Sequence, residues 1–215
     1  MIKAVIFDMD GLMFDTESVF TDVQTKMFAD RGFVFSLDIK SKLMGKKSTE
    51  IVPTINEILG TSFDPEGWMK EQDEQIIKAC KTQVVPFPGL FELLDVLDEK
   101  GVKKAIGTSA REGRVNLLLE KFNVRHRFDV IVTGDMIAKG KPDPEIYLKV
   151  LENLGVNGNE TIVLEDAQNG ITSAYRAGCL PIAIPNEYTR HNPFLEAVLV
   201  ADSFMDERLL KMITA

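Results

Sequence analysis

The stretch Ile2-Lys3-Ala4-Val5-Ile6-Phe7-Asp8-Met9-Asp10-Gly11, residues 2–11, indicates how the rest of the chain is organised. Its apolar run is typical of a buried parallel strand and is too short for a signal peptide or a membrane span. Two carboxylates, Asp8 and Asp10, follow it directly, although charge is costly to place beside a buried strand. We therefore predict a central strand over residues 2–7 that ends in a functional site.

Beyond residue 84, short apolar segments alternate with segments of helical periodicity. The segment Leu90–Glu99, for example, places its leucines on one face and ends before Gly101. Alternating strands and helices imply βαβ units and a parallel sheet that helices cover on both faces. The predicted strands are residues 103–106, 130–132, 161–164, 181–184 and 198–200, and the predicted helices are residues 90–99, 115–122, 145–154 and 171–177.

Residues 16–83 interrupt this alternation, because helical signals dominate there. One of the helices has a clear start, since Asp64 is a favourable N-cap and Pro65 a favourable first-turn residue. We therefore predict an α/β fold whose doubly wound, Rossmann-like parallel sheet is formed by residues 1–15 and 84–215. An α-helical insert, residues 16–83, interrupts this core, with helices at residues 18–31, 36–44, 48–59 and 65–81.

The composition argues against several classes of function. The 215 residues carry a formal net charge of -8, whereas proteins that bind nucleic-acid polymers carry clustered positive charge. The two cysteines, Cys80 and Cys179, are far apart and fit a reducing cytosol rather than a disulfide framework. We expect a cytoplasmic protein that binds neither membranes nor nucleic-acid polymers, and the small size of the helical insert favours a monomer.

Chemically active side chains follow the predicted strands at the points where these end. Thr108-Ser109 follow the second strand, Lys141 follows the third, and Glu165-Asp166 end the fourth. Ligands bind at the carboxyl ends of the strands in an open parallel sheet, so these groups are expected to meet Asp8 and Asp10 there. Converging carboxylates repel one another unless a cation lies among them. An oxygen-rich set without nearby histidine or cysteine fits Mg²⁺.

Three motifs occur in a specific order along the chain. They are Phe7-Asp8-Met9-Asp10-Gly11 with Asp15-Thr16-Glu17, then Gly140-Lys141-Pro142-Asp143-Pro144-Glu145-Ile146-Tyr147, and then Leu164-Glu165-Asp166 with Asn169-Gly170. Together they resemble the haloacid dehalogenase superfamily over essentially the whole chain. The resemblance is closest to the branch with a small helical cap, which includes β-phosphoglucomutase and phosphatases of sugar phosphates and nucleotides, and it implies that residues 16–83 are an α-helical cap domain. It implies a phosphohydrolase acting on a small phosphorylated substrate, a sugar phosphate or a nucleoside monophosphate.

By this resemblance, Asp8 is the nucleophile that accepts the phosphoryl group as an aspartyl-phosphate, and Asp10 is the general acid and base. Positions i and i+2 of an extended segment share a face, so both side chains can address one phosphorus atom. Thr108 and the Ser109 amide would bind phosphoryl oxygens, and Lys141 would neutralise the transferring group. The implied Mg²⁺ ligands are Asp8, Asp10 through its carbonyl, and Asp166, with Glu165 either a further ligand or a partner of the ligands.

Several neighbours of these residues have a structural interpretation beside the functional one. Asp15 and Thr16 either cap the first helix of the cap domain or contact the substrate. Asp143 is expected to be the N-cap of the next helix rather than a metal ligand. Asn169-Gly170 are expected to shape the loop that follows Asp166.

The cap departs from β-phosphoglucomutase in ways that favour a phosphatase. The mutase has a histidine where Phe20 stands here, and an arginine where Ser48 stands. That arginine helps to hold the second phosphate of a bisphosphorylated intermediate, which a mutase must retain. Lys46 and Lys47 either form a solvated helix start or contact the substrate, and Lys47 is the substrate-binding candidate. A phosphosugar mutase remains the alternative.

Two other classes of protein fit the motifs less well. A phosphate-binding or regulatory protein without turnover has no need of a nucleophile, an acid/base, a lysine and metal-binding acids together. A receiver domain of signalling proteins also combines strand-end acids, a hydroxyl and a lysine with Mg²⁺. It phosphorylates an aspartate on a later strand, however, and it has no helical insert.

Overall fold

The computed structural model describes residues 1–43 and 48–214. The chain forms two compact units, of which one is Met1–Thr16 together with Val85–Ala215. The other is Glu17–Val84. The first unit contains the sheet and the second is helical, and each is described by itself.

The described part of the sheet has six parallel strands in the order β3-β2-β1-β4-β5-β6. The central strand β1 lies between β2 and β4, with Phe7 in register with Ile106 on one side and Leu164 on the other. The strand order reverses at β1, which makes its carboxyl end the switch point where ligands bind in such sheets. The strands are β1 (Ala4–Phe7), β2 (Lys103–Gly107), β3 (Val130–Val132), β4 (Thr161–Glu165), β5 (Leu180–Ala183) and β6 (Leu199–Val200).

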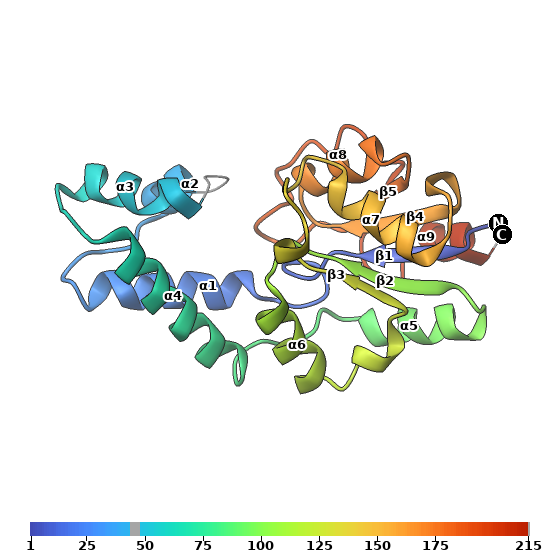
Figure 1. Cartoon of the computed structure of the whole chain (residues 1–215), viewed down its shortest axis with the longest axis horizontal. Helices are drawn as coiled ribbons and strands as arrows, with labels where there is room; N and C mark the ends of the chain where they lie inside the picture. Colours follow the sequence, from blue (N-terminus) through green and yellow to red (C-terminus); the bar gives the residue numbers. More distant parts are fainter. Residues whose placement is uncertain (44–47, 215) are drawn as a thin grey trace. The chain divides into compact units, whose positions relative to one another are not determined.

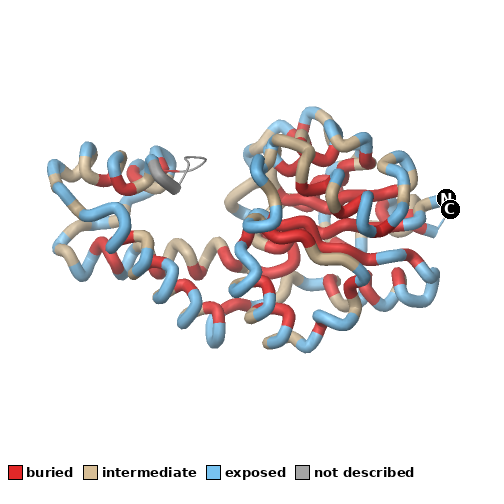
Figure 2. Tube along the Cα trace, in the orientation of Figure 1, coloured by how far each residue is buried: buried red, intermediate tan, exposed pale blue. Residues whose placement is uncertain are grey.

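Helices cover both faces of this sheet, as the alternating sequence predicts (Figure 1). Helices α5 (Leu90–Glu99) and α6 (Glu112–Lys121) lie on one face, and α7 (Glu145–Leu154) and α8 (Gln168–Arg176) lie on the other. The last helix of the described chain is α9, Glu207–Thr214. Every residue of β1 and β4 is buried, so the central strands form the core (Figure 2).

Two helices begin earlier than their apolar periodicity predicts. Helix α6 begins at Glu112 and α8 at Gln168, each three residues before the expected start. The first three residues of each helix, Glu112-Gly113-Arg114 and Gln168-Asn169-Gly170, carry no apolar side chain, so no apolar repeat marks them. The expectation that Asn169 and Gly170 shape a loop is therefore wrong, because both lie in the first turn of α8.

The helical unit has an aromatic core of its own. It consists of α1 (Glu17–Ala29), α2 (Leu37–Leu43), α3 (Ser48–Leu59) and α4 (Pro65–Cys80). Asp64 caps α4 as predicted, since its carboxylate accepts a hydrogen bond of 2.7 Å from the amide of Gly67. The rings of Phe28 and Trp68 pack edge to face, and the guanidinium carbon of Arg31 lies 4.7 Å from the centre of the Trp68 ring.

No described helix of the chain combines the length and the apolar character that crossing a bilayer requires.

Candidate active site

Three buried carboxylates meet at the carboxyl ends of β1 and β4. Oxygen atoms of Asp8, Glu165 and Asp166 lie within 4.8 Å of one another. The register of the two strands causes this, because Phe7 is paired with Leu164 and the residues that follow each of them come side by side. Three of the four acids that the sequence places at this edge are thus brought together, and the carboxylate of Asp10 is not part of the group.

The ammonium group of Lys141 forms ion pairs with two of these carboxylates, those of Asp8 and Glu165. Its Nζ donates hydrogen bonds of 2.5 Å to Asp8 Oδ1, 2.7 Å to Glu165 Oε1 and 3.0 Å to the carbonyl of Gly107. Only 9% of the Lys141 side chain is exposed. Burial opposes the charge of Lys141, but the negative charges of Asp8 and Glu165 outweigh it and raise the pKa of the ammonium group above its ordinary value. Lys141 is therefore a fixed cation at the site.

Burial has the opposite consequence for Asp8. Loss of solvent raises the pKa of Asp8 from 3.8 to about 7, although Lys141 acts to lower it. The charges of Glu165 and Asp10 add to the increase. Lys141 therefore offsets only part of the cost of burying the charge of Asp8. The electrostatics of the protein itself thus leave room for a second cation beside Asp8.

Glu165 is enclosed by its neighbours. Its Oε1 accepts a hydrogen bond from the buried hydroxyl of Tyr147 as well as from Lys141. The Lys141 ammonium also lies 5.0 Å from the centre of the Tyr147 ring. On the side of α8, a Cβ atom at Gly170 would be 1.9 Å from the Glu165 carboxyl carbon. The shape of the site therefore requires a glycine at position 170, and Glu165 holds Lys141 in place.

Asp166 is held by a residue beyond β5 that the sequence analysis missed. The side-chain amide of Asn186 donates hydrogen bonds of 2.9 Å both to Asp166 Oδ2 and to the carbonyl of Gly11. Its Oδ1 accepts a hydrogen bond of 2.8 Å from the amide of Tyr188. Asn186 thus ties the loop after β1 to the loop after β4. Asn186 lies three residues after the end of β5, so a search of the residues that follow this strand would also have found it.

The backbone and the hydroxyl of Thr108, at the start of the loop after β2, are both hydrogen-bonded. The Thr108 amide donates to the carbonyl of Val132 at 3.1 Å, and its hydroxyl accepts from the amide of Ala110 at 3.1 Å. Thr108 is buried and Ser109 is exposed. Because α6 begins only at Glu112, Thr108 is not the N-cap of that helix. A hydroxyl and a backbone amide are therefore presented at the end of β2, next to β1.

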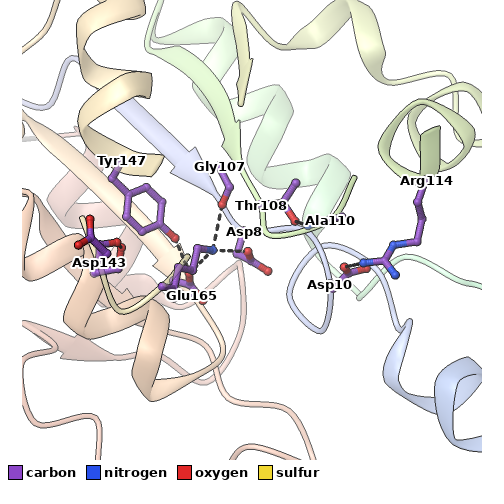
Figure 3. Close-up of polar contacts among 11 residues, drawn as sticks. Asp8, Asp10, Gly107, Thr108, Ala110, Arg114, Asp143, Tyr147 and Glu165 are labelled. Carbon is purple, nitrogen blue, oxygen red and sulfur yellow. Dashed lines mark hydrogen bonds and ion pairs between the residues drawn. The ribbon is translucent and has the colours of Figure 1, made fainter. Parts of the chain in front are cut away.

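Asp10 is turned toward α6 rather than toward the other acids. Its Oδ2 accepts a hydrogen bond from Nη2 of Arg114, as Figure 3 shows. Its Oδ1 is buried and has no hydrogen-bond partner within residues 1–43 and 48–214. Arg114 is a second residue that the sequence analysis missed. No local pattern identifies it, because the contact joins residues 104 positions apart.

The remaining candidate residues are Asp143, Thr16, Lys46 and Lys47. The expectation that Asp143 is the N-cap of the next helix is wrong, because the N-cap position of α7 is Pro144. Asp143 Oδ1 accepts a hydrogen bond of 3.1 Å from the amide of Glu145, the first residue of α7. The buried hydroxyl of Thr16 has no hydrogen-bond partner in the described part of the chain, so no cap by this hydroxyl is seen. Lys47 and Lys46 lie outside the described residues.

The comparison with protein families supports the motif analysis. The family of haloacid dehalogenase-like hydrolases matches residues 5–184. The matched range includes Asp8, Asp10, Thr108, Lys141, Glu165 and Asp166. The chain belongs to the haloacid dehalogenase-like hydrolase family. The superfamily and the α/β fold that the sequence predicts are thereby confirmed.

The relatives of the chain include named phosphatases. The Phosphorylated carbohydrates phosphatase of Thermotoga maritima is 33% identical over 177 residues, 82% of this chain and 82% of that protein. The Fructose-1-phosphate phosphatase YqaB of Escherichia coli is 29% identical and is matched over 81% of this chain and 92% of its own length. The family and these relatives identify the chain as an enzyme of the phosphatase class.

Solved structures share the architecture over nearly the whole length. CbbY from Rhodobacter sphaeroides in complex with phosphate is 28% identical, with a TM-score of 0.81 over 95% of each chain. A Thermotoga maritima structure with a provisional beta-phosphoglucomutase assignment is 31% identical, with a TM-score of 0.83 over 99% of each chain. The names of similar proteins therefore include both phosphatases and a phosphoglucomutase.

Proposed function

We propose that the chain is a Mg²⁺-dependent phosphatase of a small phosphorylated metabolite and that it works through an aspartyl-phosphate at Asp8. The observation that carries this proposal is the contact of Asp8 with the buried ammonium of Lys141, next to Asp166. A phosphoryl group brought to this sheet edge meets a nucleophilic oxygen and a fixed positive charge together. The related phosphatases are named for phosphorylated carbohydrates and fructose 1-phosphate, which favours a sugar phosphate as substrate.

The proposed reaction has two displacements at phosphorus. An oxygen of Asp8 attacks the phosphorus atom, the ester P–O bond breaks, and the leaving oxygen takes a proton from Asp10. Water then attacks the aspartyl-phosphate and gives a proton to Asp10, while the bond between phosphorus and the Asp8 oxygen breaks. Thr108 and the Ser109 amide lie at the end of the neighbouring strand, where they can donate to the phosphoryl oxygens.

The residues at this edge fit a divalent metal ion. Asp8 and Asp166 would hold it, with the backbone carbonyl of Asp10 as a third ligand, since Mg²⁺ prefers oxygen. Glu165 belongs to the same group of carboxylates, but its Oε1 is engaged by Lys141 and Tyr147. We therefore assign Glu165 to positioning Lys141. Bound Mg²⁺ supplies positive charge that neutralises the carboxylates and the phosphoryl oxygens.

We assign substrate selection to the helical unit Glu17–Val84, acting as a cap. The proposed reacting groups, those of Asp8, Asp10, Thr108 and Lys141, all lie in the sheet unit. They act on the phosphoryl group, which every candidate substrate carries, so they do not distinguish one substrate from another. The resemblance of the chain to cap-bearing phosphatases supports this division of labour. The identity of the sugar or nucleoside then depends on residues 17–84, including the candidate Lys47.

The test uses Asp8→Asn with Asp202→Asn as its matched control, because the Asp202 side chain is 97% exposed. With 4-nitrophenyl phosphate and Mg²⁺, we expect Asp8→Asn to lose at least about a thousandfold in kcat and the control to match the wild type. Phosphate release by Asp8→Asn at the wild-type rate would overturn the nucleophile assignment. Glucose 1-phosphate with a glucose bisphosphate primer tests the alternative, because its conversion to glucose 6-phosphate faster than phosphate release would identify a mutase.

A further inference from the structure

The contact between Asp10 and Arg114 is not explained by the fold alone. Arg114 lies on α6, a surface helix, whereas Asp10 lies in the loop after the central strand. Both side chains are partly buried, with 18% of Asp10 and 23% of Arg114 exposed. A partly buried ion pair is screened less by salt than a surface pair is. It therefore fixes the orientation of the carboxylate more firmly than a contact on the surface does.

The two oxygens of the Asp10 carboxylate have different surroundings. Oδ2 accepts a hydrogen bond from Arg114, and Oδ1 is buried without a hydrogen-bond partner in the described chain. A buried carboxylate oxygen without a partner is costly and rare, unless another molecule supplies the partner. The reacting atoms of a substrate and the attacking water are such partners for an acid/base group.

We propose that Arg114 is a positioning residue that holds Oδ2 of Asp10 and leaves Oδ1 as the oxygen that exchanges protons during the reaction. This inference rests on the proposed function. In the first displacement Oδ1 gives its proton to the leaving oxygen, which receives the electron pair of the broken P–O bond. In the second displacement Oδ1 takes a proton from the water that attacks phosphorus. Arg114 pairs with the carboxylate between these two transfers.

This role predicts a dependence on the leaving group. A 4-nitrophenolate ion leaves without a proton, whereas a 4-methoxyphenolate ion leaves much faster when an acid protonates it. The kcat/KM ratio reports the steps up to transfer of the phosphoryl group to Asp8. For Arg114→Ala we expect kcat/KM to fall about tenfold to a hundredfold with 4-methoxyphenyl phosphate, and no more than about threefold with 4-nitrophenyl phosphate.

The second displacement gives an independent readout. If Asp10 is misplaced as a base, hydrolysis of the aspartyl-phosphate becomes slow even with the better leaving group. Rapid mixing of Arg114→Ala with 4-nitrophenyl phosphate should then show a burst of about one 4-nitrophenolate per enzyme molecule. A purely structural role for Arg114 would lower the amount of active enzyme without creating a burst or a leaving-group dependence.

The controls separate this inference from the proposed function. Arg114→Lys keeps a cation at Oδ2, so it should recover part of the loss and serves as the test variant if Arg114→Ala does not fold. Arg125→Ala removes an exposed arginine elsewhere in the sheet unit and should behave as the wild type. Equal losses with both aryl phosphates would overturn the role of Arg114. A wild type that releases no phosphate from either would instead overturn the proposed function.

Discussion

The carboxyl group of Glu165 lies against the Cα atom of Gly170, so that a Cβ atom at position 170 would be only 1.9 Å from the Glu165 carboxyl carbon. Glycine in a helix ordinarily lowers stability by about 1 kcal/mol relative to alanine. The helix α8 therefore gives up some intrinsic stability to let Glu165 reach Lys141 and Tyr147.

Gly170→Ala should consequently destabilise the protein, although the substitution improves helix propensity. Overpacking of this kind costs about 1–3 kcal/mol, which exceeds the gain in propensity. We expect a lower Tm in thermal denaturation and a fall of about tenfold or more in kcat, because displaced Glu165 no longer fixes Lys141.

The matched control is Gly113→Ala in α6. A Cβ atom there meets no atom within 4 Å, so this variant should be unchanged or stabilised by up to about 1 kcal/mol. Equal effects of the two substitutions would show that Gly170 matters only as a helix residue.

The hydrogen bonds of Asn186 predict an effect on metal affinity. Removing a residue that orients a metal ligand typically weakens binding by about tenfold to a hundredfold. We expect Asn186→Ala to raise the Kd for Mg²⁺ by that factor, measured by calorimetry on the protein without substrate. Asn192→Ala is the control, because Asn192 donates to the Thr189 carbonyl in the same loop and to neither Asp166 nor Gly11. An unchanged Kd in Asn186→Ala would contradict both the role of Asn186 and that of Asp166.

The raised pKa of Asp8 predicts how Mg²⁺ and pH act together on stability. In the folded, metal-free protein the pKa of Asp8 is about 7, against an ordinary value of 3.8. Between these values the folded state holds a proton that the unfolded state releases, so this group's contribution to the free energy of unfolding falls as pH rises. Mg²⁺ binds the ionised carboxylate and competes with that proton.

The measurement is the increase in Tm on adding Mg²⁺ at two values of pH. We expect a larger increase at pH 8 than at pH 5, by several degrees, and a small increase in Asp8→Asn at both. An increase that is equal at the two pH values would show that Asp8 is not a ligand.

A second ion pair predicts pH-dependent stability at the opposite end of β2. The buried Lys104 ammonium contacts the Asp98 carboxylate, and so does Arg127. The hydrogen bond from Lys104 lowers the pKa of Asp98 against the effect of burial, and Arg127 adds to the decrease. A lowered pKa stabilises the fold above the ordinary value of 3.8, and this stability is lost as pH falls through the lower folded value.

Asp98→Asn should therefore lower the free energy of unfolding at pH 7 by about 1–2 kcal/mol, a figure reduced because Asp98 is half exposed. The Tm difference from the wild type should be smaller at pH 3 than at pH 7. Asp95→Asn is the control, since Asp95 contacts Arg127 and is 67% exposed. A difference that does not change with pH would show that the charge of Asp98 is not the cause.

The sequence predicted most of the sheet and the centre of the site. Parallel strands bring the residues after their carboxyl ends together, so the positions of Asp8, Glu165 and Asp166 follow from strand assignment, whereas Lys141 reaches Asp8 from a loop that begins nine residues earlier, at the end of β3. Helix boundaries were less accurate, because the first turns of α6 and α8 carry no apolar repeat.

The contacts that the sequence did not reveal depend on how the elements pack. Gly170, which the sequence analysis assigned to a loop, is needed because the Glu165 side chain on β4 lies against it, and Arg114 meets Asp10 only once α6 is packed on the sheet. The spacing of Asp8 and Asp10 suggested that both carboxylates face one phosphorus atom. In the structure the two turn to different cations, Lys141 and Arg114.

The three contacts of Lys141 have a consequence for repeated turnover. An ammonium group has three N–H bonds, and the acceptors Asp8, Glu165 and the Gly107 carbonyl match them in number. Two of the three acceptors are parts of the scaffold that no substrate alters. Lys141 therefore keeps its place whether Asp8 carries a phosphoryl group or not. Its ammonium group is already in position when the next substrate binds.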